Sequence, residues 1–205
     1  MALIDCSETS GTELFVVEGL SAANALSSVR DRRHQAVLPM QGKIPNANRI
    51  SVEKLMQHPQ VGELLQSIHP DGQMRAPTTQ FRFERVILLG DPDVDGLHAG
   101  LLLVLFLSTQ VPSLVEQGGL FIVRAPLYGF FQNDECIAVA YADRHATAVS
   151  QKLTERFSMQ STRRRFKGIA SLDANQRRSL MAKDNPARHQ LTMIECGQLC
   201  QPIVS

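Results

Sequence analysis

Three aspartates alternate with other residues in the stretch GDPDVDG, which spans residues 90–96. On an extended chain alternate side chains project to the same side, so the carboxylates of Asp91, Asp93 and Asp95 can crowd one volume. Such carboxylates repel one another unless a cation compensates their charge. The spacing therefore predicts a metal site, although a single Asp here could also serve as a helix cap.

The metal that this spacing favours is magnesium rather than calcium. A calcium loop of the EF-hand type needs a bidentate acidic ligand at its twelfth position and a helix in front of it. With Asp91 as the first position the twelfth is Leu102, and the apolar run RVILLG precedes the motif. Magnesium prefers hard oxygen ligands and keeps waters and a phosphate oxygen in its shell. The motif thus indicates phosphate chemistry at the end of a buried strand.

A fourth acid, Glu18, ends another apolar run, ELFVVE. If both runs are strands of one parallel sheet, their carboxyl ends meet at the same edge, where ligands gather in such sheets. Glu18 would then join the aspartates as a metal ligand or act as a general acid or base. His98, just inside the following helix, would either support the metal or play a structural part, and the residues alone favour neither role.

Apolar periodicity predicts an alternation of strands and helices over the first 126 residues. The expected strands span residues 13–19, 35–40, 85–91 and 119–126. The expected helices span residues 21–33, 51–68 and 97–118, the second interrupted by Pro59 and the third by Pro112. Strands that alternate with helices form a parallel sheet with helices on both faces. We therefore expect an α/β fold with a four-stranded, mostly parallel sheet and flanking helices.

Beyond Pro126 the pattern changes to that of a small C-terminal α+β tail. A hairpin is expected to turn at Asn133-Asp134, followed by helices over residues 143–157 and 173–184. A basic stretch, STRRRFKG, lies between these helices. Residues 74–81 have the composition of a loop, and the segment beyond residue 190 has no assigned structure.

The bulk composition limits the functional classes. With 205 residues, 43% of them hydrophobic and 20% charged, the chain can bury a core and is expected to be globular. A formal net charge of +1 excludes a globally basic nucleic-acid-binding protein. Any DNA contacts must come from local clusters such as RDRRH at residues 30–34 and RRRFK at residues 163–167. Solvated arginines at helix ends are the alternative explanation of the first cluster.

Cysteine usage and the absence of a targeting segment favour an intracellular protein. Four cysteines occur without a Cys-x-x-Cys pair, which favours free thiols in a reducing cytosol over a structural metal site. The N-terminus lacks an apolar core of signal-peptide length, and the run LLLVLFL at residues 101–107 is too short to span a bilayer. We therefore expect a cytoplasmic protein without membrane contact.

Several segments, in order, resemble one family. Glu18-Gly19 and Asp91-x-Asp93-x-Asp95-Gly96, each at the end of a strand, look like the toprim domain that topoisomerases and primases share. The segments LIDCSETSGTELFVVEGLSA, RDRRHQAVLPMQGKIPN, RVILLGDPDVDGLH, APLY and RRFKG resemble the C-terminal half of the B subunits of DNA gyrase and topoisomerase IV. The resemblance implies a toprim domain at residues 11–126, a gyrase-B-like C-terminal tail at residues 127–190 and an unassigned end at residues 191–205.

This resemblance implies a type IIA topoisomerase module that binds Mg2+, with Mn2+ as a substitute. By resemblance, Glu18, Asp91 and Asp93 are catalytic and hold the metal, and Asp95 is a further ligand. The metal would stabilise charge on the scissile phosphate while Glu18 handles the proton of the departing 3′ oxygen. The DNA-binding residues that the resemblance implies are Lys43, Arg164, Arg165 and Lys167.

The resemblance also implies partners. In this family the nucleophilic tyrosine lies on the A subunit, and neither Tyr128 nor Tyr141 matches a catalytic position. The ATPase domain of the family precedes the toprim region, so no ATP site is expected in this chain. The expected partners are double-stranded DNA, a gyrase-A-like subunit and a separate ATPase subunit. Alone, the chain is expected neither to hydrolyse ATP nor to form a tyrosyl–DNA bond.

The surroundings of the metal motif depart from the family pattern. Where the family reads EGDSAGG this chain reads EGLSAAN, so Leu20 replaces an acid. Gly100 stands where an Arg is usual, and YKGLGEM has become FKGIASL, which contains Ile169-Ala170-Ser171. These departures favour an alternative, a non-catalytic paralogue that binds DNA or the A subunit and regulates it. A weaker alternative is a metal-dependent toprim nuclease that uses water as its nucleophile.

Overall fold

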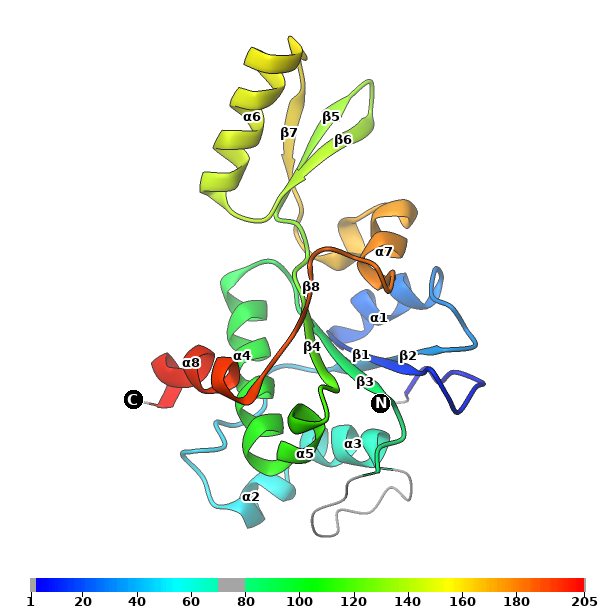
Figure 1. Cartoon of the computed structure of the whole chain (residues 1–205), viewed down its shortest axis with the longest axis vertical. Coiled ribbons are helices and arrows are strands. Elements are labelled where there is room, and N and C mark those ends of the chain that lie inside the picture. Colours follow the sequence, from blue (N-terminus) through cyan, green and yellow to red (C-terminus); the bar gives the residue numbers. More distant parts are fainter. Residues whose placement is uncertain (1–2, 70–79, 205) are drawn as a thin grey trace.

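Four apolar segments form the parallel core of the main sheet, as their composition predicts. The computed structural model describes residues 3–69 and 80–204, and in it these strands run in the order β2-β1-β3-β4 (Figure 1). All three pairings between these strands are parallel, and Leu14 of β1 lies opposite both Ala36 and Val86. The bounds are β1 (Glu13–Glu18), β2 (Gln35–Met40), β3 (Arg85–Leu89) and β4 (Leu120–Val123).

A fifth strand, β8 (Arg188–Gln190), extends this sheet beyond the four strands expected from the sequence. It pairs antiparallel with β4, with His189 opposite Ile122. Because it is short and two of its residues are exposed, it carries no apolar pattern by which a strand could be recognised. The main sheet is thus mostly parallel, with one antiparallel edge strand.

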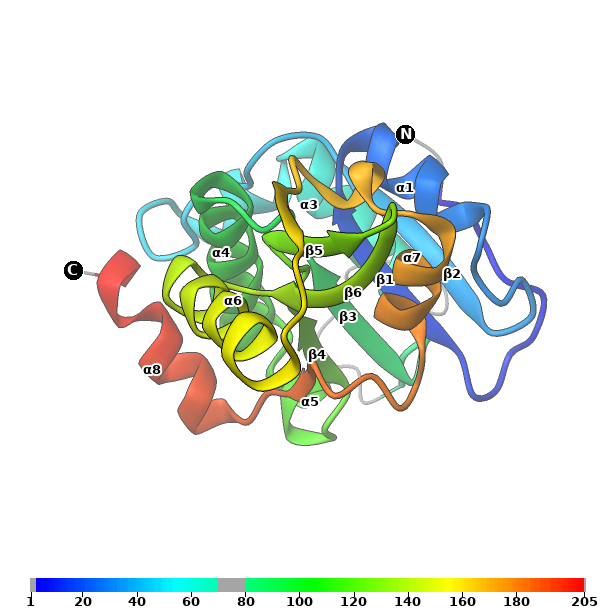
Figure 2. The same cartoon turned by 90° about the horizontal axis from the view of Figure 1, so that it is seen from above.

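Helices cover both faces of the sheet, because successive strand residues point alternately to its two sides (Figure 2). Leu14 and Val16 of β1 face one layer, and Phe15 and Val17 face the other. The first layer contains α2 (Val52–Met56), α3 (Pro59–Ile68), α4 (Val94–Gln110), α5 (Pro112–Glu116) and α8 (Met193–Val204). The second contains α1 (Gly19–Ser27), the 3-10 turn η1 (Ile169–Ser171) and α7 (Ala174–Met181).

Two prolines set helix boundaries inside the predicted helical regions. Pro59 and Pro112 are each the first residue of a helix, where a missing backbone N–H breaks no hydrogen bond. The region 51–68 therefore forms two helices, and the region 97–118 forms α4 and α5. The helix predicted over residues 21–33 is too long, since α1 ends at Ser27. The predicted loop at residues 74–81 lies almost entirely outside the described residues.

Residues 128–165 form a smaller part above the main sheet, with a sheet and a core of its own (Figure 1). Its strands follow the order β6-β5-β7 and are all antiparallel. The helix of this part packs Ala146 and Leu153 against Phe130 and Ala140 of the sheet. The bounds are β5 (Tyr128–Gln132), β6 (Glu135–Ala140), α6 (Asp143–Phe157) and β7 (Thr162–Arg165).

The hairpin and the helix predicted for this part are confirmed. Asn133 and Asp134 form the turn with φ values of 50° and 63°, the left-handed conformation of a tight hairpin. Helix α6 has the predicted bounds. Strand β7 is an addition to the prediction, because its sequence TRRR is entirely exposed and shows no apolar alternation.

After β7 the chain returns to the main body, where its last segment forms α8. This helix, unassigned from the sequence, buries Cys196 and Cys200 in the first layer. These two cysteines, Cys6 and Cys136 are free thiols, as predicted. Over the described ranges, no helix combines the length and the apolar character that crossing a membrane requires.

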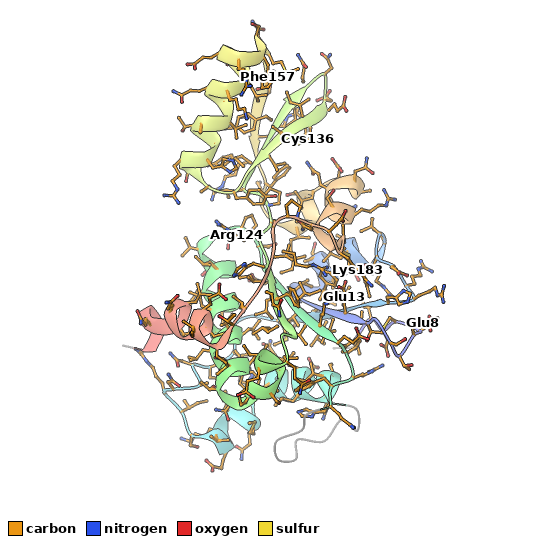
Figure 3. All side chains as sticks on the ribbon, in the orientation of Figure 1. Glu8, Glu13, Arg124, Cys136, Phe157 and Lys183 are labelled. Atoms are coloured by element: carbon orange, nitrogen blue, oxygen red, sulfur yellow. The ribbon has the colours of Figure 1, made fainter. Side chains whose placement is uncertain are left out.

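A buried ion pair anchors β8 to the start of β1. The side chains of Glu13 and Arg188 are 1% and 5% exposed, and Arg188 Nη1 donates to Glu13 Oε1 over 2.6 Å. Gln35 and Arg85 donate to the same carboxylate over 3.0 and 3.2 Å. Burial alone would raise the pKa of Glu13, but these hydrogen bonds together outweigh it and hold the pKa below its ordinary value. Figure 3 marks the position of Glu13 in the main sheet.

Replacing Arg188 by Ala is expected to destabilise the fold by about 3 kcal/mol, since a buried carboxylate then loses its main partner. The lowered pKa of Glu13 stabilises the fold above the ordinary value of 4.5, and this contribution is lost as the pH falls through the folded value. The difference in unfolding free energy between the variant and the wild type should therefore become smaller at acidic pH. Urea denaturation at a series of pH values measures it.

The matched control for this prediction is Arg156→Ala, at an exposed position on α6. A surface substitution of this kind should change stability by less than about 0.5 kcal/mol. An Arg188→Ala variant as stable as the control, or a difference independent of pH, would contradict the anchoring role of the pair.

Candidate metal centre

The carboxyl ends of β1 and β3 lie side by side at one edge of the main sheet. Val17 of β1 pairs with Leu89 of β3, so Glu18 and Gly90 leave the sheet at the same level. Asp91 follows Gly90 directly. Two acids from distant parts of the sequence therefore meet at one edge, which we call the acidic edge.

Asp91 is held by three residues, Gly96, Gly168 and Ile169, which we call the Asp91 clamp. The Ile169 N–H donates to Asp91 Oδ1 over 2.9 Å. A Cβ on Gly168 would lie 2.7 Å from Asp91 Oδ2, and a Cβ on Gly96 would lie 2.3 Å from the Asp91 carbonyl oxygen. A side chain at either position would displace Asp91, so the close packing requires glycine. The clamp thus fixes one carboxylate with residues from two distant segments.

The other two aspartates are engaged by separate partners. Asp93 is the N-cap of α4, which begins at Val94, and accepts a hydrogen bond from the Gly96 N–H over 2.8 Å. Asp95 lies in the first turn of α4 and accepts a hydrogen bond from Lys43 Nζ over 2.7 Å. The expectation that residues 91–95 form one extended run is therefore wrong, because the helix starts inside the motif. The helix-cap role considered for one aspartate applies to Asp93.

Glu18 has a buried carboxylate oxygen without a partner. Its Oε2 accepts no hydrogen bond from any part of the chain that the structure describes. Burial raises the pKa of Glu18, and the nearby charges of Asp91 and Asp93 raise it further. Burial also raises the pKa of Asp91, although its hydrogen bond from Ile169 works against the change. Binding of a proton or a cation stabilises carboxylates in this state.

The donor set fits a magnesium ion, although the side chains do not enclose one by themselves. Within residues 3–69 and 80–204, no three His, Cys, Asp or Glu side chains gather into a ready-made metal site. Magnesium needs only one or two protein carboxylates, because water and phosphate oxygens complete its shell. The unpartnered oxygen of Glu18 and the clamped carboxylate of Asp91 meet that need.

Two of the predicted DNA-binding cations lie beside the acidic edge. Lys43 follows β2 and forms an ion pair with Asp95, and its Nζ holds the pKa of that carboxyl below the ordinary value. Lys167 is exposed and immediately precedes Gly168 of the Asp91 clamp. Both positions suit contacts to phosphates near a metal ion.

The other two predicted cations lie on the smaller sheet. Arg164 forms an ion pair with Asp134 over 2.6 Å, and its guanidinium lies 4.5 Å from the centre of the Phe131 ring. Arg165 is exposed at the end of β7. Arg164 thus contacts the hairpin, whereas Arg165 forms no ion pair within the described part of the chain.

The remaining candidates from the sequence lie elsewhere or are exposed. The cluster RDRRH precedes β2 and so lies at the amino end of the strands, opposite the acidic edge. There Arg33 pairs with Glu8 over 2.9 Å, and His34 pairs with Asp31 over 2.8 Å. His98 is exposed on α4 and takes no part in the packed core.

A groove beside the acidic edge contains residues that the sequence pattern does not single out. It has a volume of about 190 Å3, and its lining includes Asp91, Asp93, Arg124 and Tyr141. Arg124 directly follows β4, so the tendency of ligands to gather at the carboxyl ends of parallel strands could have identified it. Tyr141 follows β6 of the smaller sheet, and no local sequence pattern indicates that it lines this groove in the folded chain.

These features define a class of protein. A mostly parallel α/β sheet, with a Glu closing one strand and an Asp-x-Asp motif following its neighbour, is typical of toprim domains. The family model described as "Toprim domain" matches residues 13–124, which is more than half of the chain. The chain belongs to the toprim domain family.

Its curated relatives include the B subunits of topoisomerase IV and of gyrase. The chain is 34% identical over 176 residues to the DNA topoisomerase 4 B subunit of Rickettsia bellii, and the match covers 83% of this chain and 26% of that protein. It is 32% identical over 205 residues to the novobiocin-sensitive DNA gyrase B subunit of Streptomyces niveus, and this match covers 96% of this chain and 29% of that protein. The chain thus spans between a quarter and a third of these relatives.

Replacing Gly168 by Ala is expected to push the Asp91 carboxylate from its position and to break the hydrogen bond from Ile169. Changes to groups that orient a metal ligand weaken metal binding by about 10–100-fold. Overpacking should also destabilise the fold by about 1–3 kcal/mol. Calorimetric titration with Mg2+ and Mn2+, below the melting temperature of each variant, measures the affinity.

Gly62→Ala is the control, because a Cβ on Gly62 in α3 would meet nothing within 4 Å. It should stabilise the helix by about 0.5–1 kcal/mol and leave metal binding unchanged. Equal metal affinity in Gly168→Ala and Gly62→Ala would refute the positioning role of the clamp.

The metal-free protein should become more stable at neutral pH when Glu18 is replaced by Gln. The raised pKa of Glu18 means that the folded state favours its protonated form, so stability is lost as the pH rises from the ordinary value of 4.5 through the folded value. Solvent screens this partly exposed group, so the gain at neutral pH is about 1 kcal/mol at most, or about 2–4 °C in melting temperature.

Two further measurements complete this prediction. Magnesium should raise the melting temperature of the wild type and leave that of Glu18→Gln nearly unchanged, since a ligand stabilises only the state that binds it. A variant no more stable than the wild type at neutral pH in EDTA would show that Glu18 is not under electrostatic stress.

Proposed function

We propose that this chain is the magnesium-binding toprim module of a type IIA DNA topoisomerase of the gyrase B kind. It would take part in cleavage and religation of double-stranded DNA in the cytoplasm, together with a tyrosine-bearing A subunit and a separate ATPase chain. The observation that carries the proposal is the unpartnered oxygen of Glu18 beside the clamped Asp91. Similarity to the B subunits of topoisomerase IV and gyrase supports it.

The proposed mechanism gives the residues of the acidic edge separate tasks. A magnesium ion, when bound, would stabilise negative charge on the scissile phosphate. Glu18, Asp91 and Asp93 would hold the ion. The carboxylate oxygen of Glu18 that does not hold the ion would handle the proton of the departing 3′ oxygen. Lys43 and Lys167 would bind neighbouring phosphates.

The surface around the acidic edge favours a protein partner. Leu20 is 46% exposed, Val94 83% and Leu97 59%. They belong to the first turns of α1 and α4, which begin directly after Glu18 and Asp93. Exposed apolar side chains grouped around a polar centre are typical of protein interfaces. The proposed occupant is the A subunit, which would bring its tyrosine to the metal and exclude water.

The proposal predicts cleavage of plasmid DNA when the chain is combined with a gyrase A subunit, an ATPase chain and magnesium. Glu18→Ala and Asp91→Ala should each reduce cleavage by about 100-fold or more, because each removes a charged group from the reacting phosphate. Gel electrophoresis of plasmid after detergent and protease treatment measures cleavage.

Glu155→Ala, at an exposed position on α6, is the control and should cleave like the wild type. Equal cleavage by Asp91→Ala would refute the metal role. DNA products formed by the isolated chain with magnesium or manganese would instead favour the nuclease alternative.

One observation favours the second candidate function, a regulatory paralogue without chemistry. Leu20 is exposed beside the acidic edge where the resembling family has an acid, and Lys43 neutralises Asp95. The first turn of α1 contains no acid, so Leu20→Asp suits the positive end of the helix. This variant should cleave DNA several-fold faster if the first proposal holds. No cleavage by wild type or variant, with retained binding to the A subunit, would favour regulation.

A further inference from the structure

A second hollow, which we call the waist trough, lies between the main body and the smaller part. It has a volume of about 650 Å3 and is lined by Arg124, Tyr141, Ala142, Arg144, His145, Pro186 and Ala187. Arg124 lies at the narrow waist of the molecule (Figure 3). The trough shares Arg124 and Tyr141 with the groove that contains Asp91 and Asp93. The two hollows therefore adjoin at these two residues.

The trough presents two arginines with uncommitted charges. Arg124 and Arg144 are both exposed, and neither forms an ion pair with another residue in the described part of the chain. Asp143, the acid next to Arg144, accepts a hydrogen bond from the Tyr128 hydroxyl over 2.6 Å. Two guanidinium groups beside one hollow suit two anions such as phosphates, which arginine binds through paired N–H groups.

The trough also has an aromatic wall made of Tyr141 and His145. Their rings are nearly parallel, with 10° between the planes and 6.1 Å between the centroids. The Tyr141 N–H donates to His145 Nδ1 over 3.3 Å, which holds the histidine ring in place. Tyr141 is half-buried and His145 is exposed. The outer face of such a stacked pair can contact a base or a sugar.

We propose that the waist trough binds a segment of one nucleic-acid strand. Its phosphates pair with Arg124 and Arg144, and a base or sugar lies against Tyr141 and His145. A hollow of this volume is in the range of small-ligand sites, so it takes a nucleotide or two of a single strand. The continuation of that strand to the acidic edge rests on the proposed function, whereas binding in the trough does not.

An acidic peptide fits the trough less well than a nucleic-acid strand. The two arginines would attract its carboxylates, but the wall of Tyr141 and His145 would have no partner. A nucleic-acid strand uses both the cations and the rings, as single-strand-binding surfaces do.

Fluorescence anisotropy of the full chain with a labelled single-stranded oligonucleotide tests the inference, in EDTA so that no metal contributes. The double variant Arg124→Ala/Arg144→Ala should bind more weakly. Its slope of log Kobs against log salt should be less negative by about 1.4, since each phosphate contact to a single strand contributes about −0.7. Tyr141→Leu should bind about tenfold more weakly with an unchanged slope, because stacking carries no charge.

The controls separate loss of contacts from loss of folding. Arg156→Ala/Arg178→Ala removes the same charge from exposed positions on α6 and α7 that do not line the trough, and should bind like the wild type. Arg124→Lys/Arg144→Lys keeps the charge and should restore the slope. Circular dichroism and thermal melts check the fold of each variant.

Equal slopes for the trough variant and the control variant would overturn the inference. So would displacement of the oligonucleotide by poly-glutamate together with unchanged binding by Tyr141→Leu, which would assign the trough to an acidic protein partner. A reduced slope in a protein that cleaves no DNA would support the trough and refute only the topoisomerase function. Active cleavage with unchanged slopes would refute only the trough.

Discussion

The parallel pairing of β1 with β3 is the constraint on which the candidate metal centre depends. Because Val17 lies opposite Leu89, the two strands end at one level, and Glu18 emerges beside the segment that carries Asp91. Carboxylates brought together in this way lose hydration and repel one another, and their pKa values rise for both reasons. The edge of the sheet thus carries an electrostatic cost that a divalent cation would offset.

The rest of the chain keeps this edge from relaxing. Asp91 cannot move away from Glu18, because Gly96 and Gly168 pack against it and the Ile169 N–H holds its carboxylate. The segment that supplies Gly168 and Ile169 comes after the smaller part. The ion pair between Glu13 and Arg188, 175 positions apart, then ties the following chain to the main sheet. The C-terminal segments therefore help to hold the acidic edge in place.

The features predicted correctly from the sequence are those that depend on local pattern. Apolar runs identified β1 to β4, and the Asn133-Asp134 turn identified the hairpin. The start of α4 inside the aspartate motif was missed, because Asp is favoured both at an N-cap and as a magnesium ligand. Strand β8 and Tyr141 were missed because their places depend on contacts between distant segments, which no local pattern records.

The individual acids of the candidate metal centre have different environments. Capping by Asp93 and pairing of Asp95 with Lys43 tie up two carboxylates, and Leu20 adds no charge where the resembling family has an acid. Each of these features reduces the repulsion at the edge, yet none relieves the buried oxygen of Glu18. The close contacts of Gly96 and Gly168 with Asp91 keep a second carboxylate beside it. A cation held at this edge would offset the repulsion between these carboxylates.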